Sequence, residues 1–111
     1  MKFFTRLSDV AAIPENGHTS YEMLTEANGC VAGCCTGVSI YPEIEYSGIN
    51  VHDDQEGFFV LEGSGWAKVG DQEFPIEPAV SFIVPAKTPH CIKKDPTSKP
   101  VKAFWFHSAI G

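Results

Sequence analysis

Short runs of alternating apolar and polar residues, separated by turn-forming residues, restrict the fold of this chain more than any other feature. The 111 residues include ten glycines and eight prolines, which recur between these runs. Glycine and proline disfavour helix interiors, and alternation with a period of two is typical of strands with one face in a core. The sequence therefore predicts an all-β protein with little or no helix.

The runs predict eight or nine short strands. The clearest candidates are residues 36–41, 58–61, 66–69, 72–76, 80–84, 90–94 and 101–107, with a looser edge strand at residues 19–25. Gly70 and Asp71 between two of these runs indicate a hairpin. Many short strands with turn signals between them favour an antiparallel sandwich or a small barrel.

Residues 58–61, Phe-Phe-Val-Leu, form an uninterrupted apolar run. A strand that is apolar on both faces is expected to be buried on both. The cover on the second face would be another sheet or a partner subunit.

Charge and hydropathy exclude several classes of partner. The net charge of −6, without a Lys/Arg cluster, disfavours nucleic acid. No apolar run approaches the ~20 residues that cross a bilayer. Charges near the N-terminus, where a signal peptide needs an apolar region, make the cytoplasm the expected location. No repeat or linker divides residues 1–111, which are expected to form one domain.

Four cysteines, Cys30, Cys34, Cys35 and Cys91, are expected to be free thiols in a reducing compartment. Residues 30–35 are interpreted as small apolar residues of a strand, since free cysteine packs like a small hydrophobe. A metal or redox role for this segment is the alternative, but the second paired half of a zinc site is missing.

A candidate metal site begins at His52 and Glu56. In an extended backbone, Asn50, His52, Asp54 and Glu56 point to the same face. His90 follows a Pro-x3-Pro segment and directly precedes another apolar strand start. Two imidazoles and one carboxylate from neighbouring strands would form a three-point site for a divalent ion, with positions left open for water or substrate. The alternative is that residues 52–56 form a solvated polar loop.

The remaining candidates are interpreted as lying outside the site. We expect a solvated loop or surface position for His18, Asp53, Asp54 and Lys87, a structural or solvated role for His107, and a side chain turned away from the cavity for Cys91. By strand parity, the expected cavity walls are Phe58, Val60, Phe104 and Phe106, each of which is alternatively plain core.

These motifs resemble those of a small single-domain cupin, the cupin type-2 conserved barrel. Residues 56–63 match the Glu-x6-Gly element of the first cupin motif, and His52 fits its second histidine. Pro85 and His90 fit the proline and histidine of the second motif. The resemblance covers residues 34–107, with residues 1–33 as N-terminal strands and loops. It implies a double-stranded β-helix (jelly-roll) barrel.

The resemblance also implies a ligand set of three histidines and one glutamate, from which this chain departs. Asn50 replaces the first histidine, Ile44 the leading glycine, and Lys87 and Lys94 the glycine and asparagine of the second motif. His52, Glu56 and His90 remain as metal ligands. Asn50 is either a weak, neutral fourth ligand or leaves its position to water.

The implied function is metal-dependent chemistry of the oxygenase, isomerase or decarboxylase type on a small polar molecule. Fe, Mn, Ni, Zn and Cu are all candidates for the ion, and no catalytic residue is assigned. The alternative is a non-catalytic cupin that binds or senses a sugar-like molecule. Small cupins often pair, so the resemblance also favours a homodimer.

Overall fold

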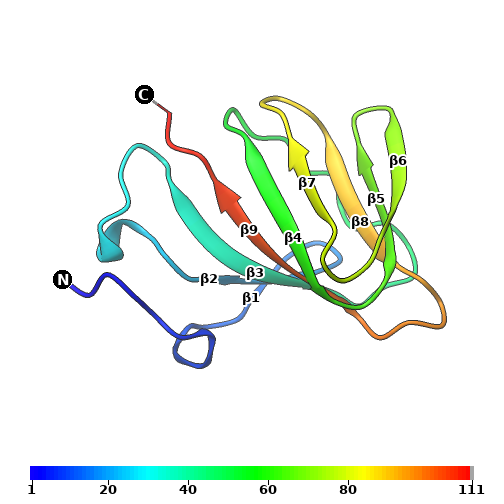
Figure 1. Cartoon of the computed structure of the whole chain (residues 1–111), viewed down its shortest axis with the longest axis horizontal. Helices are drawn as coiled ribbons and strands as arrows, with labels where there is room; N and C mark the ends of the chain where they lie inside the picture. The colour runs from blue at the N-terminus through cyan, green and yellow to red at the C-terminus, as the bar shows by residue number, and fades with distance from the viewer. Residues whose placement is uncertain (111) are drawn as a thin grey trace.

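Two antiparallel sheets share one core in the computed structural model, which describes residues 1–110 (Figure 1). The larger sheet has the order β1-β2-β3-β9-β4-β7, and the smaller has the order β6-β5-β8. The strands are β1 Ile13–Pro14, β2 Thr19–Glu22, β3 Cys35–Tyr41, β4 Glu56–Glu62, β5 Gly65–Val69, β6 Gln72–Ile76, β7 Ser81–Val84, β8 His90–Lys94 and β9 Val101–His107. Two single 3-10 turns, Leu7–Asp9 and Glu26–Asn28, are the only helical elements within residues 1–110.

The all-β prediction is confirmed, and most predicted strands lie within a residue or two of the observed ones. The predicted hairpin is β5–β6, which pairs Val69 with Gln72 across Gly70-Asp71. The residue at position 70 has a positive φ of 60°, a conformation that glycine adopts without steric strain. The last strand, β9, inserts between β3 and β4 (Figure 1), so the C-terminal residues of the chain lie at the centre of the larger sheet.

Two local predictions were wrong. Residues 19–25 do not form an edge strand, because β1 pairs outside β2 and only Thr19–Glu22 is extended. Residues 30–35 are mostly a turn: Ala32 and Gly33 have positive φ values of 56° and 87°, which a strand does not allow. Only Cys35 belongs to a strand. All four cysteines are free thiols.

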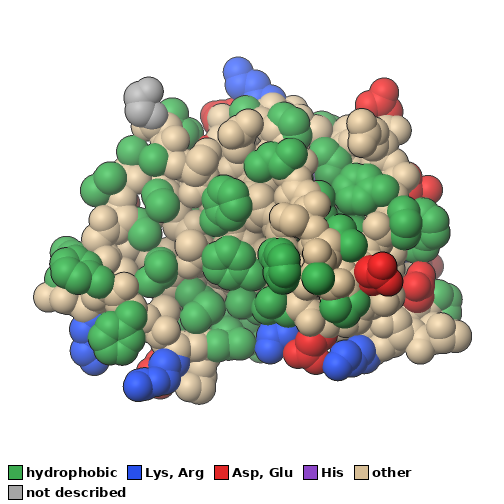
Figure 2. All heavy atoms as spheres, viewed as in Figure 1, with side chains coloured by type: hydrophobic (Ala, Val, Ile, Leu, Met, Phe, Trp, Pro, Cys, Tyr) green, Lys and Arg blue, Asp and Glu red, His purple; other side chains and the backbone are tan. Residues whose placement is uncertain are grey.

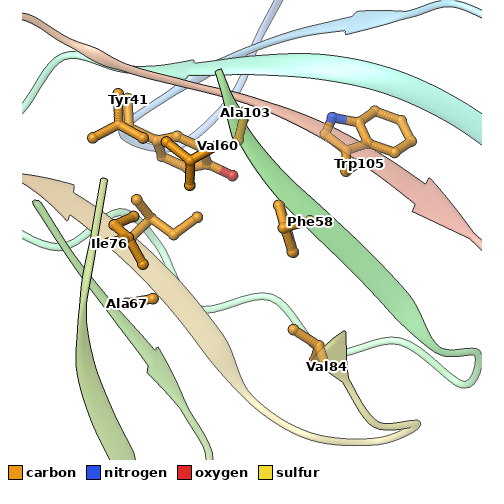
Figure 3. Close-up of a cluster of buried hydrophobic side chains, with 10 residues drawn as sticks. Tyr41, Phe58, Val60, Ala67, Ile76, Val84, Ala103 and Trp105 are labelled. Carbon is orange, nitrogen blue, oxygen red and sulfur yellow. The ribbon is translucent and has the colours of Figure 1, made fainter. Parts of the chain in front are cut away.

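The core lies where the two sheets face each other, and Figure 3 shows its side chains converging from both sheets. Val60, Val101 and Ala103 from the larger sheet are fully buried, as is Ala67 from β5. Ile76 of β6 is 2% exposed. Burial of apolar side chains on these inner faces holds the two sheets together.

The outer face of the larger sheet is apolar and exposed in the single chain, so no sheet of this chain covers the second face of β4 among the described residues. In β4, Phe58 and Val60 point inward, whereas Phe59 and Leu61 are 43% and 42% exposed. Ile83 of β7 and Phe106 of β9 are similarly exposed. We call Phe59, Leu61, Ile83 and Phe106 the outer apolar face. Figure 2 shows hydrophobic side chains gathered over the middle of this side of the molecule, with most charged residues near its margins.

Gly57 allows this face to pack closely. It pairs with Ile83 on one side and with Phe106 on the other. A side chain at this position would begin 2.2 Å from the Phe106 ring, so the absence of a side chain lets that ring lie across the strand.

No helix within residues 1–110 is long and apolar enough to cross a membrane.

We predict that Gly65→Ala strongly destabilises the fold. A Cβ at this position would lie 2.0 Å from the backbone oxygen of Lys93 in the paired strand, and backbone cannot move aside as a flexible side chain does. The free energy of unfolding, measured by urea denaturation, is expected to fall by about 3 kcal/mol, the upper range for overpacking.

Gly33→Ala is the matched control. Gly33 has a positive φ of 87°, but no heavy atom lies within 4 Å of the position that a Cβ would occupy. The expected loss is only the backbone strain, about 1 kcal/mol. Equal losses in the two variants would contradict the assignment of close packing at Gly65.

Candidate metal centre

A cavity of about 270 Å³ opens at one end of the core. Its walls come from the inner face of the larger sheet, from the start of β8 and from the loop before β4. The sequence-predicted residues Asn50, His52, Glu56 and His90 all line this cavity. The alternative interpretation of residues 52–56 as a freely solvated loop is therefore wrong for His52 and Glu56.

Glu56 is the central residue of the cavity. It is the first residue of β4, and only 5% of its surface is exposed. Its Oε1 lies 3.0 Å from Nε2 of His90 and 3.4 Å from Nε2 of His52. One ligand atom from each of the three residues lies within 4.8 Å of the other two. The structure thus brings together the carboxylate and both imidazoles named from the sequence.

Backbone hydrogen bonds fix the two segments that carry the imidazoles. Asn50 and His90 form an isolated antiparallel bridge, with N–H···O distances of 3.1 and 3.0 Å. The N–H of Lys87 donates to the carbonyl of His52 at 2.6 Å. Lys87 has a positive φ of 62°, in the sharp turn between Pro85 and Pro89. These contacts place His52 and His90 side by side, with ring centroids 5.3 Å apart.

A third imidazole, His107, also reaches Glu56. It pairs directly with Glu56 across β9 and β4, and its Nε2 lies 3.4 Å from Oε2 of the carboxylate. Its Nδ1–H donates to Asp54, at 3.0 and 3.1 Å from the two carboxylate oxygens. The side chains of His107 and Asp54 are only 15% and 13% exposed. The predicted solvation of Asp54 was therefore wrong, and His107 is part of the cavity wall.

These contacts shift the pKa values of the cavity residues. Burial alone would raise the pKa of Glu56, but hydrogen bonds from His107 and His90 outweigh it and lower the pKa to about 2. Hydrogen bonds to Glu56 and Asp54 raise the pKa of His107 to about 9, against the effect of burial. Burial lowers the pKa of His52. Glu56 is thus an anion. Among the described residues, imidazoles lie within ion-pair distance of its carboxylate, whereas no lysine or arginine does.

The parity prediction for β9 was wrong. Trp105 and His107 line the cavity, whereas Phe106 is exposed on the outer face and Phe104 lies in an outer groove with Phe3 and Phe4. Phe58 does line the cavity, and Val60 is core. The signal for the correct assignment was Lys102, whose charge identifies the solvent side of β9 and so places the odd-numbered residues inside.

His18 also belongs to the cavity wall rather than to a solvated loop. Its ring stacks on Tyr41 with centroids 4.8 Å apart, and burial lowers its pKa. Asp53 and Lys87 are exposed, as predicted. Cys91 is buried but does not line the cavity.

Aromatic rings and hydroxyl groups make up much of the remaining wall. Trp105 donates its indole N–H to Oγ of Ser39 at 2.8 Å, and Ser39 in turn hydrogen-bonds Ser20 at 2.9 Å. Tyr41 and Phe58 add apolar surface. Within the described part of the chain no lysine or arginine lines the cavity. The walls therefore suit a small molecule with both polar and apolar parts.

The donor set fits a divalent transition metal. Imidazole nitrogens suit Zn, Cu, Fe and Ni, and a carboxylate adds a hard, negatively charged oxygen. Three protein ligands leave coordination positions for water or a substrate, as in catalytic sites. Nδ1 of His90 donates to the carbonyl of Thr88 at 3.2 Å, the kind of outer contact that fixes the tautomer of a metal-binding histidine.

Comparison with known proteins identifies relatives of this fold. The family described as "Cupin domain" matches residues 37–107. No curated protein matches the sequence. Among solved structures, the Fe(II) form of HppE with an alternative substrate has 16% identity and a TM-score of 0.81 over 95% of this chain and 59% of that one. This chain spans about three fifths of the length of the HppE chains that it matches.

Two other solved structures show the same fold. A predicted oxalate decarboxylase from Thermotoga maritima is 13% identical with a TM-score of 0.80, over 95% of this chain and 97% of that one. The polyketide cyclase RemF from Streptomyces resistomycificus is 17% identical with a TM-score of 0.74, over 93% and 77%. At these identities the matches establish the fold, and the predicted barrel class is confirmed.

Proposed function

Because the chain belongs to the cupin domain family, we propose that it binds a divalent metal ion in its barrel and acts as a metal-dependent enzyme on a small polar molecule. His52, Glu56 and His90 are the proposed ligands. In the typical ligand set, the first-motif position that Asn50 occupies here carries a histidine. Asn50 is proposed to supply an amide oxygen or to leave its position to water. Fe, Mn, Ni, Zn and Cu remain candidates.

One observation carries this proposal. The buried carboxylate of Glu56 lies 3.0 Å from Nε2 of His90 and 3.4 Å from Nε2 of His52, two imidazole nitrogens that can bind a metal when neutral. Burial of an ionised carboxylate is unfavourable by several kcal/mol unless the charge is compensated. No lysine or arginine lines this cavity among the residues that the structure describes. His107, whose pKa is raised to about 9, supplies part of this compensation. A divalent cation would supply it as well and would use the lone pairs of the imidazoles at the same time.

Cavity size and wall chemistry restrict the substrate. A volume of about 270 Å³ accommodates only a small molecule, near the lower limit of ordinary ligand sites. A bound ion would supply Lewis acidity or redox chemistry, which supports an oxygenase, isomerase or decarboxylase type of reaction. The hydroxyl groups of Ser20, Ser39 and Tyr41 and the rings of Phe58 and Trp105 would hold and orient the substrate beside it.

The first test is the metal content of protein purified without an affinity tag. We expect about one equivalent of a transition metal, as purified or after reconstitution, by elemental analysis. His90→Ala is expected to lower this content sharply, because it removes one of the three proposed ligands, while circular dichroism shows an intact fold.

His18→Ala is the matched control, because His18 lines the same cavity but stacks on Tyr41. It is expected to keep the metal. Absence of bound Fe, Mn, Ni, Zn and Cu in the wild-type protein, both before and after reconstitution, would overturn the proposed function.

A second candidate function is non-catalytic binding of a sugar-like molecule. The replacement of a ligand histidine by Asn50 and the hydroxyl-bearing wall formed by Ser20, Ser39 and Tyr41 favour it. Trp105 and Phe58 provide apolar surface against which a sugar ring packs. This protein would bind its ligand without turnover.

A thermal-shift screen of small sugars and polar metabolites separates the two functions. For the binding function, we expect a ligand that raises the melting temperature in proportion to the logarithm of its concentration and is recovered unchanged. The screen should use both metal-free and metal-loaded protein. Recovery of a chemically altered ligand would exclude the non-catalytic function.

We also propose that the outer apolar face packs against the same face of a second copy. Its four residues come from adjacent strands and carry no charge, so two such sheets can stack at the usual spacing of about 10 Å. A symmetric dimer would place the charged margins of the two acidic chains away from the contact centre. The uninterrupted apolar sequence of β4 is explained by this burial on both faces.

The homodimer predicts that the wild-type protein has twice the monomer mass by light scattering. Phe59→Lys with Phe106→Lys is expected to yield a monomer, because two lysines from each copy would be desolvated in the contact. Ile44→Lys is the control, since Ile44 is also apolar and 55% exposed but lies in a loop outside the sheets. A wild-type monomer at all concentrations would contradict the dimer.

We further propose that residues 1–33 are part of one cupin domain with residues 34–107. β2 pairs with β3 over four residue pairs, so the N-terminal segment extends the larger sheet.

A further inference from the structure

His107 lies in neither of the two sequence segments that carry the proposed ligands, yet its imidazole reaches the same carboxylate. It comes from the last strand, β9, and lies directly opposite Glu56. Its ring centroid is 4.8 Å from that of His52, closer than the 5.3 Å between His52 and His90. Three imidazoles therefore surround one buried carboxylate.

His90 and His107 are held in the same way. In each residue Nδ1–H donates to an oxygen, which is the Thr88 carbonyl for His90 and the Asp54 carboxylate for His107. In each residue Nε2 then faces Glu56, at 3.0 Å for His90 and 3.4 Å for His107. A histidine that donates one ring N–H to a carboxylate or carbonyl and directs the other nitrogen into a polar cavity has the arrangement of a metal ligand.

Charge supports the same role for the pair of Asp54 and His107. Glu56 contributes one negative charge at the proposed ligand cluster, and Asp54 lies behind His107 with a second. Glu15 and Glu22 also line the cavity, whereas no lysine or arginine of the described chain does. The acidic wall favours a cation, and Asp54 would hold the His107 imidazole in place beside it.

We propose that His107 is a fourth protein ligand of the metal ion and replaces the imidazole that Asn50 lacks, with Asp54 as the residue that positions it. This inference rests on the proposed metal-binding function. The group of ligand atoms within 4.8 Å comprises only His52, Glu56 and His90, whereas His107 contacts the other oxygen of Glu56. To bind the ion, Nε2 of His107 would release to solvent the proton that faces Glu56, while Nδ1–H keeps its hydrogen bond to Asp54.

The test compares metal affinity and the number of nitrogen ligands in four variants. Zn(II) or Co(II) is titrated into metal-free protein by calorimetry, and X-ray absorption of the loaded protein counts the nitrogen ligands. His107→Ala is expected to remove one nitrogen ligand. It is also expected to weaken binding by more than about 100-fold, the largest loss typical of a residue that contacts a metal ligand but not the metal itself. Asp54→Asn is expected to weaken binding about tenfold without a change in the nitrogen count.

Two matched controls are available. Asp53→Asn changes an adjacent, exposed carboxylate, and His18→Ala removes a cavity histidine that stacks on Tyr41. Both are expected to keep the wild-type affinity and nitrogen count. If His107→Ala fails to fold, His107→Gln tests the same point, because its amide can still donate to Asp54 but adds no imidazole nitrogen.

The outcomes separate this inference from the proposed function. Loss of a nitrogen in the His107 variant, with a change in the Co(II) absorption bands, supports ligation. An unchanged nitrogen count overturns it, whether or not the affinity falls, because a weaker affinity alone would make His107 a positioning residue. Wild-type protein that binds neither ion overturns the proposed function itself, independently of His107.

Discussion

The buried carboxylate of Glu56 is the constraint on which the arrangement of this protein depends. A carboxylate with 5% exposure requires compensation, and the chain supplies it with imidazoles from three separate segments. His52 comes from the loop before β4, His90 from the start of β8 and His107 from the end of β9. Because removal of one partner of a buried charge is more destabilising than loss of an exposed pair, these segments are held to one geometry.

The sheet topology brings these segments together. β9 lies beside β4 in a register that sets His107 against Glu56, so one imidazole is positioned by strand pairing alone. The other two depend on a turn and a bridge, because residues 51–55 are not in a strand. The paired backbone hydrogen bonds of Asn50 and His90 connect the loop to β8, and this link joins the two halves of the site.

Most of the fold and three residues of the candidate site could be predicted from the sequence, for local reasons. Strand positions follow from alternation and from the glycines and prolines between runs, which depend only on neighbours in the chain. Glu56, His52 and His90 follow from short motifs with fixed spacing. Asp54 could not be recognised in this way, because its partner is 53 residues away and a carboxylate beside Asp53 has the local character of a solvated loop.

The error in β9 has a similar physical origin. Residues 104–107, Phe-Trp-Phe-His, offer no polar-apolar alternation, because aromatic side chains lie on both faces of the strand. The pattern becomes clear only from Lys102, which is oriented toward Glu62 at 3.6 Å on the outer side. Once that residue is assigned to solvent, Ala103, Trp105 and His107 must point inward.

The same two strands serve both faces of the larger sheet, and this explains why their sequences are so apolar. β4 carries Glu56 and Phe58 on the inner face and Phe59 and Leu61 on the outer face. β9 places His107 inside and Phe106 outside in the same manner. The proposed ion on the inner face and the proposed second copy on the outer face would therefore act on opposite sides of the same pair of strands.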